Sequence, residues 1–97
     1  MNPSNTISSK IEAFADRVCD ALHVTMDDIF PEAHARTRRY RRQAEARWVV
    51  MKACRHVYMM PYKEIGAQFG KDHSTIIHGV RKFDERIKQS REFKKFV

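Results

Sequence analysis

Hydrophobic residues recur along the first third of the chain at the spacing of one helical face. Positions 11, 14, 15, 18, 19 and 22 are apolar, and mostly charged residues lie between them. This spacing matches the 3.6-residue period of an amphipathic helix. Thr25 and Asp28 then have the spacing of a capping box, and Pro31 disfavours helical geometry at the residue before it. We therefore expect a long helix followed by a short helix that ends near residue 31.

The apolar pattern returns after an arginine-rich connector and predicts three more helices. Residues 44–59 carry a broad apolar face that is typical of a central helix. Pro61 suits the first turn of a short helix ending at Phe69, and Gly70 suits the left-handed residue after it. Asp72 suits the N-cap of the last long helix. On the helix over residues 44–59 we expect the buried positions to be Ala46, Val50, Ala53, Cys54 and Val57. On the helix after Asp72 we expect them to be Ile76, Ile77, Val80, Phe83 and Ile87.

Few residues interrupt this helical pattern. The chain has 97 residues with only three glycines and three prolines, and it has few alternating β-branched runs. Its length is that of one domain. We therefore expect an all-α fold, in which residues 9–97 form a compact helical domain after a polar lead-in at residues 1–8.

Charge is distributed unevenly along the chain, whose formal net charge is +7. Residues 1–35 carry two basic and six acidic side chains, whereas residues 36–97 carry seventeen basic and six acidic ones. Five of the arginines fall within residues 36–42. Because such a cluster repels itself unless anions neutralise it, the basic half of the chain predicts a polyanionic partner such as DNA.

Several other classes of protein do not fit the sequence. No apolar stretch is long enough for a membrane span and the N-terminus has no secretory signal, so we expect a cytoplasmic protein without a membrane partner.

Cys19 with His23, or Cys54 with His56, could be imagined as zinc ligands, but both cysteines lie on apolar helix faces and no C-x-x-C pair exists. Residues 72–74 contain the residue types of a hydrolase triad, but sequence neighbours cannot adopt its geometry. We therefore expect no enzyme activity, metal, cofactor or small-molecule substrate.

The two helices predicted over residues 61–88 have the layout of a helix-turn-helix. A tight turn at Gly70 and Lys71 joins them. In this motif the second helix points its N-terminal side chains at base edges in the major groove of DNA. The side chains at residues 72–75, which we call the reading head, are short and polar, whereas Ile76 directly after them suits a core.

The string from Ile65 to His78, IGAQFGKDHSTIIH, resembles a known signature. That signature is I-G-x-x-F-G-G-R-D-H-T-T-V-x-H, from the C-terminal DNA-binding domain of DnaA, the bacterial replication initiator. The likeness in layout extends from about residue 13 to residue 90. It implies a Trp-repressor-like helical domain that binds short duplex sequences called DnaA boxes. In that family the reading head contacts bases in the major groove, while an arginine of the basic loop enters the adjacent minor groove.

The resemblance also implies roles for individual residues. By position, Asp72, His73 and Ser74 would read bases, and Thr75 and Lys71 would contact phosphates. The other positions expected to contact phosphates or the minor groove are Arg36, Arg38, Arg39, Arg41, Arg42, Arg47, Arg55, Arg81 and Lys82. The basic loop that supplies the first five spans residues 36–42.

The chain departs from the family pattern in the turn and in the reading head. It has one glycine where the family usually has two, Lys71 stands for an arginine, and Ser74 stands for the first threonine. Pro61 replaces a serine, and residues 31–35 look inserted. These departures bear on which DNA sequence is bound. Nothing in the chain matches the phosphate-binding loop G-x-x-x-x-G-K-[ST], so neither ATP hydrolysis nor ATP-driven origin melting is expected.

The function expected from the sequence is binding of double-stranded DNA at DnaA-box-like sites. We expect a stand-alone, nucleoid-associated protein that regulates replication initiation or transcription without ATPase activity. Two alternatives stay open. One is a transcriptional regulator whose operator is unrelated to replication. The other is a protein-interaction module that binds a replication protein through its acidic N-terminal helix.

Overall fold

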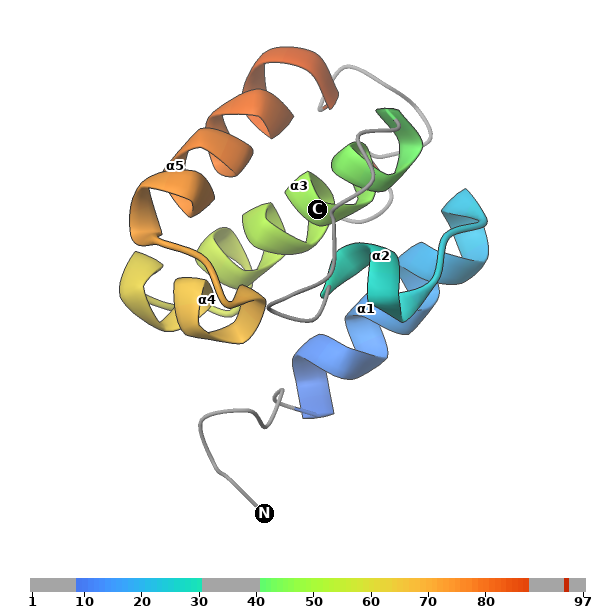
Figure 1. Cartoon of the computed structure of the whole chain (residues 1–97), viewed down its shortest axis with the longest axis horizontal. Helices are drawn as coiled ribbons and strands as arrows, with labels where there is room; N and C mark the ends of the chain where they lie inside the picture. The colour runs from blue at the N-terminus through green and yellow to red at the C-terminus, as the bar shows by residue number, and fades with distance from the viewer. Residues whose placement is uncertain (1–8, 31–40, 88–93, 95–97) are drawn as a thin grey trace.

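The computed structural model describes residues 9–30, 41–87 and 94, and these residues are helical with short connections (Figure 1). The described part contains no strand, so the all-α prediction is confirmed. The helices are α1 (Ser9–Leu22), α2 (Met26–Ile29), α3 (Arg41–His56), α4 (Tyr62–Phe69) and α5 (His73–Lys82), followed by the π-helical turn η2 (Phe83–Ile87). None of these helices is both long enough and apolar enough to cross a membrane.

Helix α3 is the centre of the fold. It packs against α1 and α2 on one side and against α4, α5 and η2 on the other (Figure 1). Apolar side chains from all of these elements meet around it, because each amphipathic helix must bury its apolar stripe against a neighbour. The large side chains with almost no exposed surface are Phe83, Ile11, Leu22, Ile29, Ile65, Ile76, Ile87, Val18, Val49, Val50 and Cys54.

The capping box predicted for the short second helix is present. The Thr25 hydroxyl accepts a hydrogen bond from the Asp28 amide at 3.2 Å, and the Asp28 carboxylate accepts one from the Thr25 amide at 3.0 Å. Helix α2 ends at Ile29, which is fully buried. The ring of Phe30 lies 4.7 Å from that of Phe69, so the end of α2 contacts α4. These contacts connect the N-terminal helices to the helix-turn-helix.

Helix α3 differs from its predicted range of 44–59 at both ends. It already includes Arg41, whose side chain pairs with that of Glu45 one turn later at 3.5 Å. It ends at His56, where the amide of Met60 donates to the carbonyl of Cys54 and turns the chain away. The prediction of a buried Val57 is therefore wrong, since this side chain lies beyond the helix and is 52% exposed.

The helix-turn-helix consists of α4, a tight turn and α5. Pro61 precedes α4 as its N-cap residue, and Gly70 ends α4 in the predicted left-handed conformation with φ 63°. The Lys71 amide donates to the carbonyl of Gly66 at 2.9 Å and closes the turn. An added Cβ atom at Gly66 would lie 2.5 Å from the Lys71 carbonyl oxygen, so this glycine permits the close approach of α4 and the turn.

Helix α5 buries a slightly different face from the one predicted. Ile76, Gly79 and Val80 are buried, and η2 continues the face with Phe83. Ile77 is only half-buried, which corrects its predicted place in the core. Gly79 packs against Met51 and Trp48 of α3. Because position 79 is buried, the buried face of α5 is centred away from Ile77.

Candidate nucleic-acid interface

The reading head lies on the surface at the start of α5. All four of its side chains are exposed, whereas Ile76, directly after them, is fully buried. Helix α5 is therefore anchored through its apolar face while its first turn stays accessible. This is the arrangement that a recognition helix needs to enter a DNA groove.

Hydrogen bonds connect three side chains within the reading head. The Ser74 hydroxyl donates to Asp72 Oδ2 at 2.9 Å, and Asp72 Oδ1 lies 3.1 Å from His73 Nδ1. The Asp72 and His73 side chains are 69% and 62% exposed. The hydrogen bond from Ser74, supported by the neighbouring imidazole, holds the pKa of Asp72 below its usual value.

Asp72 occupies the predicted N-cap position but does not cap the helix with its side chain. Its backbone is extended, with φ −67° and ψ 151°, as an N-cap residue requires. Its carboxylate makes no capping hydrogen bond to the first turn of α5. The reason is that its two oxygens face Ser74 and His73 instead.

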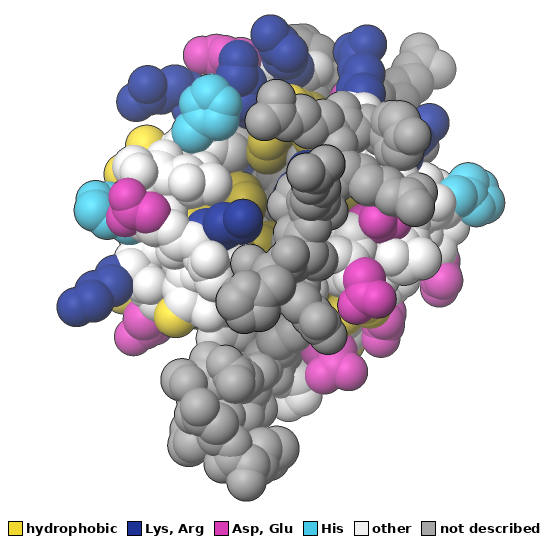
Figure 2. All heavy atoms as spheres, viewed as in Figure 1, with side chains coloured by type: hydrophobic (Ala, Val, Ile, Leu, Met, Phe, Trp, Pro, Cys, Tyr) yellow, Lys and Arg dark blue, Asp and Glu magenta, His cyan; other side chains and the backbone are white. Residues whose placement is uncertain are grey.

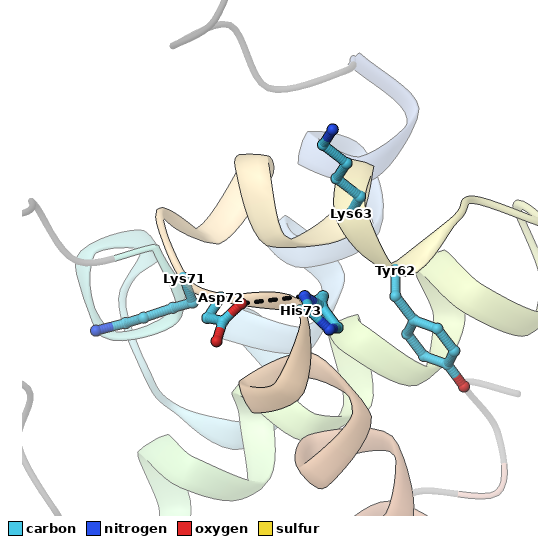
Figure 3. A pocket seen from close by; sticks show the side chains of 5 residues that line it. All are labelled: Tyr62, Lys63, Lys71, Asp72 and His73. Carbon is cyan, nitrogen blue, oxygen red and sulfur yellow. Dashed lines mark ion pairs between the residues drawn. The ribbon is translucent and has the colours of Figure 1, made fainter.

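A hollow of about 590 Å³ lies beside the reading head (Figure 3). It is lined by Asp72 and His73 together with Tyr62, Lys63 and Lys71. In Figure 3 the two lysine side chains extend away from the Asp72–His73 pair in different directions. Tyr62 and Lys63 were not among the residues predicted from the sequence. They reach the reading head because the first turn of α4 lies close to the start of α5, which no local sequence pattern reveals.

The exposed face of α5 continues the reading head along the helix. Ser74, His78 and Arg81 follow the i, i+4, i+7 spacing of one face and all three are exposed. Lys82 is half-buried. His78 was not among the residues predicted from the sequence, although its helical spacing places it on the same face as Ser74 and Arg81.

Arg55 was expected to contact phosphate and also makes contacts inside the protein. Its guanidinium lies 4.6 Å from the centre of the Tyr62 ring and donates to the carbonyl of Met60 at 3.1 Å. It therefore holds the connection between α3 and α4 beside the hollow. A guanidinium has five N–H donors, so these contacts leave donors for a phosphate.

Arg47 was expected to contact phosphate as well, and its guanidinium connects α3 to α2. It donates to the Asp28 carbonyl oxygen at 2.8 Å. Burial lowers the pKa of Arg47, partly offset by the nearby Asp28 carboxylate. This arginine thus has a structural role that its sequence position did not indicate.

The basic loop predicted over residues 36–42 falls only partly within the described structure. Arg41 and Arg42 lie in the first turn of α3 rather than in a loop, and both are exposed. The positions of Arg36, Arg38 and Arg39 lie outside the described residues.

The charge step along the sequence corresponds to two regions of the surface (Figure 2). Acidic side chains gather where α1 and α2 lie, and these helices carry Glu12, Asp16, Asp20, Asp27 and Asp28. Most of the lysine and arginine side chains in this view lie on the upper rim, where the end of α5 and the start of α3 lie, although acidic side chains also occur there and along the left edge. The basic side chains thus predominate on the upper rim of the face shown, and the acidic ones over α1 and α2.

The cysteine and histidine pairs do not come together as a metal site among the residues with described positions. No group of three or more potential His, Cys, Asp or Glu ligands occurs there. Cys19 and Cys54 are both buried and unbridged. Burial raises the pKa of Cys19 to about 11, with help from nearby aspartates, and raises that of Cys54 to about 12.

Comparison with known proteins agrees with this geometry. The profile of the family described as "Bacterial dnaA protein helix-turn-helix" matches residues 11–83. The chromosomal replication initiator protein DnaA of Aquifex aeolicus is 34% identical over 89 residues, which cover 91% of this chain and 21% of that protein. DnaA of Spiroplasma citri is 31% identical over 81 residues, which cover 82% of this chain and 17% of that protein. DnaA of Citrifermentans bemidjiense is 46% identical over 52 residues, which cover 53% of this chain and 11% of that protein. The chain thus spans about a fifth or less of the length of these relatives, and it belongs to the bacterial DnaA helix-turn-helix family.

Proposed function

We propose that this protein binds double-stranded DNA at DnaA-box-like sequences and thereby regulates replication initiation or transcription. The observation that carries the proposal is the exposed reading head on a helix whose next residue, Ile76, is fully buried, within a helix-turn-helix of the DnaA family. In this proposal the first turn of α5 enters the major groove, where base edges differ from one another.

The proposed contacts divide into base reading and backbone binding. Asp72, His73 and Ser74 read bases. Lys71 and Thr75 bind phosphates next to them, and the remaining basic positions extend this grip along the DNA. Those positions are Arg36, Arg38, Arg39, Arg41, Arg42, Arg47, Arg55, Arg81 and Lys82. Phosphate contacts supply most of the affinity but little of the specificity.

The proposal contains no step that uses ATP. The family is a DNA-binding helix-turn-helix rather than a catalytic domain, and these 97 residues contain no phosphate-binding loop motif. Regulation would follow from occupancy, because a protein on a short duplex site excludes or recruits other proteins there. We place this activity in the cytoplasm, at the nucleoid.

Salt dependence and one pair of variants test the proposal together. If about six phosphates are neutralised, the logarithm of the binding constant should fall with the logarithm of salt concentration at a slope near −5. His73→Ala should weaken binding to the selected site by about 1–3 kcal/mol and leave binding to random duplex nearly unchanged. Arg81→Ala, a matched change on the same exposed face, should weaken both equally. A slope near zero, or equal losses for His73→Ala on both duplexes, would count against the proposal.

The departures at Lys71 and Ser74 favour a second candidate, a transcriptional regulator with an operator unlike a DnaA box. Both residues lie in or beside the reading head, where a change of side chain alters the base that is read. Selection of bound sequences from a random duplex pool separates the two. Single, non-palindromic sites support the DnaA-like function, whereas paired half-sites protected by a dimer support the unrelated operator.

A further inference from the structure

The hollow between the first turn of α4 and the start of α5 has the size of a small-molecule site. Its volume is about 590 Å³, and pockets for small ligands usually measure about 300–1,000 Å³. Four of its side chains are exposed and the fifth, Tyr62, is half-buried. The walls therefore present a phenol ring, an imidazole, a carboxylate and two ammonium groups to a ligand, from Tyr62, His73, Asp72, Lys63 and Lys71.

The ring of Tyr62 is a surface on which a planar group can stack. The Arg55 guanidinium lies 4.6 Å from its centre and restrains the ring from one face. Because Tyr62 is only half-buried and lines the hollow, another part of the ring stays accessible there. Aromatic rings in such positions bind nucleobases by stacking, whichever base it is.

The Asp72 carboxylate has two hydrogen-bond positions left for a ligand. The two oxygens of a carboxylate together accept about four hydrogen bonds. The Ser74 hydroxyl takes one position on Oδ2 at 2.9 Å, and His73 Nδ1 faces one on Oδ1 at 3.1 Å. One position on each oxygen remains, which suits a ligand edge that carries two N–H donors side by side.

The two lysines supply positive charge at the edges of the hollow. In Figure 3 the side chains of Lys63 and Lys71 extend away from the Asp72–His73 pair in different directions, and Tyr62 lies on the other side of that pair from Lys71. A lysine ammonium binds phosphate oxygens as a point charge. A ligand that satisfies all of these groups has a planar ring, a pair of N–H donors and phosphates.

We propose that the hollow binds a guanine nucleotide with two or more phosphates, and that this nucleotide competes with DNA. The N1–H and N2–H groups of guanine lie side by side and match the two remaining positions on Asp72. Adenine and cytosine present an amino group beside a ring acceptor, and uracil has one N–H between two acceptors, so none of them matches. The base stacks on Tyr62, and the phosphates reach a lysine. The competition, though not the binding itself, rests on the proposed function, which assigns Asp72 and His73 to DNA.

Titration calorimetry on the full chain tests the ligand class with GDP as the probe. The comparison ligands are ADP, guanosine and inorganic pyrophosphate. We expect GDP to bind at least about tenfold more tightly than each of them, because only GDP carries both the guanine edge and the phosphates. Equal binding of GDP and pyrophosphate would reduce the hollow to a general anion site and overturn the proposal, and equal binding of GDP and ADP would overturn the choice of guanine.

Three variants locate the site. Asp72→Asn presents one donor and one acceptor, so it should bind ADP more tightly than GDP. Tyr62→Leu should weaken GDP binding at least about fivefold through the loss of stacking. Lys71→Ala should weaken it as well, whereas the matched control Lys10→Ala removes the same charge from an exposed position on α1 outside the hollow and should not. Circular dichroism checks that each variant keeps its helices. An unchanged preference in Asp72→Asn, or equal losses in the two lysine variants, would contradict the site.

Fluorescence anisotropy with a labelled duplex, selected from a random pool, tests the competition. GDP should displace the duplex at concentrations near its own dissociation constant, and ADP should not at the same concentrations. GDP binding without displacement would overturn the competition. A chain that binds duplex but not GDP would overturn this inference and leave the proposed function standing. A chain that binds GDP but no duplex would overturn the proposed function and leave the nucleotide site.

Discussion

Replacing Gly66 by alanine should weaken both the fold and DNA binding, although alanine is the better helix former. Gly66 lies inside α4, where alanine is favoured over glycine by about 0.5–1 kcal/mol from helix propensity alone. The structure predicts the opposite sign. An added Cβ atom would lie 2.5 Å from the Lys71 carbonyl oxygen, a separation that folded proteins essentially never show.

The loss of stability in Gly66→Ala depends on how far the Lys71 carbonyl must move. The Lys71 carbonyl would have to withdraw by about 0.5 Å to reach even 3.0 Å, and it is backbone rather than a flexible side chain. Overpacking of this kind costs about 1–3 kcal/mol. After the gain in helix propensity is subtracted, we expect the free energy of unfolding to fall by about 1–2 kcal/mol. Each kcal/mol of this loss should lower Tm by roughly 4–8 °C. Because Lys71 directly precedes the reading head, the shift should also displace Asp72 and weaken DNA binding.

Urea denaturation and fluorescence anisotropy measure the two effects, and Gly70→Ala is the matched control. Gly70 lies four residues later with φ 63° and open space around its position, so alanine there should cost about 1–2 kcal/mol of backbone strain. It should leave the separation between α4 and the turn, and hence DNA affinity, unchanged. If Gly66→Ala is more stable than the natural chain, or binds DNA as the natural chain does, the argument from close approach is refuted.

The remaining predictions concern the core residue Ile76, the half-buried Arg47 and the two buried cysteines. Ile76→Ala should lower the free energy of unfolding by about 2–5 kcal/mol in urea denaturation, because Ile76 is fully buried beneath the reading head; a loss under about 0.5 kcal/mol would contradict its place in the core. Arg47→Ala should cost about 1.5–3 kcal/mol in the same assay by removing the hydrogen bond to the Asp28 carbonyl, and an unchanged stability would show that this bond contributes nothing. At pH 8 Cys19 and Cys54 should react with a thiol reagent only after unfolding, since burial raises their pKa values from about 9 to about 11 and about 12. Because the folded thiols hold their protons to higher pH than the unfolded ones, stability should also fall as pH rises above 9, and a rise in stability there would contradict the burial.

The helices and the turn could be predicted because their signals are local. Apolar spacing identified the helix over residues 9–22 and the buried body of α5, and the left-handed Gly70 followed from its place after Phe69. The limits of α3 could not be predicted as well. Val57 continues the apolar period, yet the amide of Met60 bonds back to Cys54 and ends the helix before it.

Only part of the candidate site could be predicted from the sequence, for the same reason. The exposed position of residues 72–75 could be predicted, because a short polar run before a buried residue is visible in the sequence. The contacts of Arg47 and Tyr62 could not. Arg47 bonds to a carbonyl nineteen residues earlier, and Tyr62 lines the hollow only because α4 and α5 pack together. Such contacts depend on the tertiary fold rather than on any local pattern.

The most direct test of the account is the ratio of two dissociation constants measured at one physiological salt concentration. One is for the duplex selected from a random pool, and the other is for a scrambled duplex of the same length and composition. A helix that reads bases from the start of α5 should bind the selected duplex about 10³-fold or more tightly than the scrambled one. Equal dissociation constants would contradict the claim that residues 72–74 read DNA sequence.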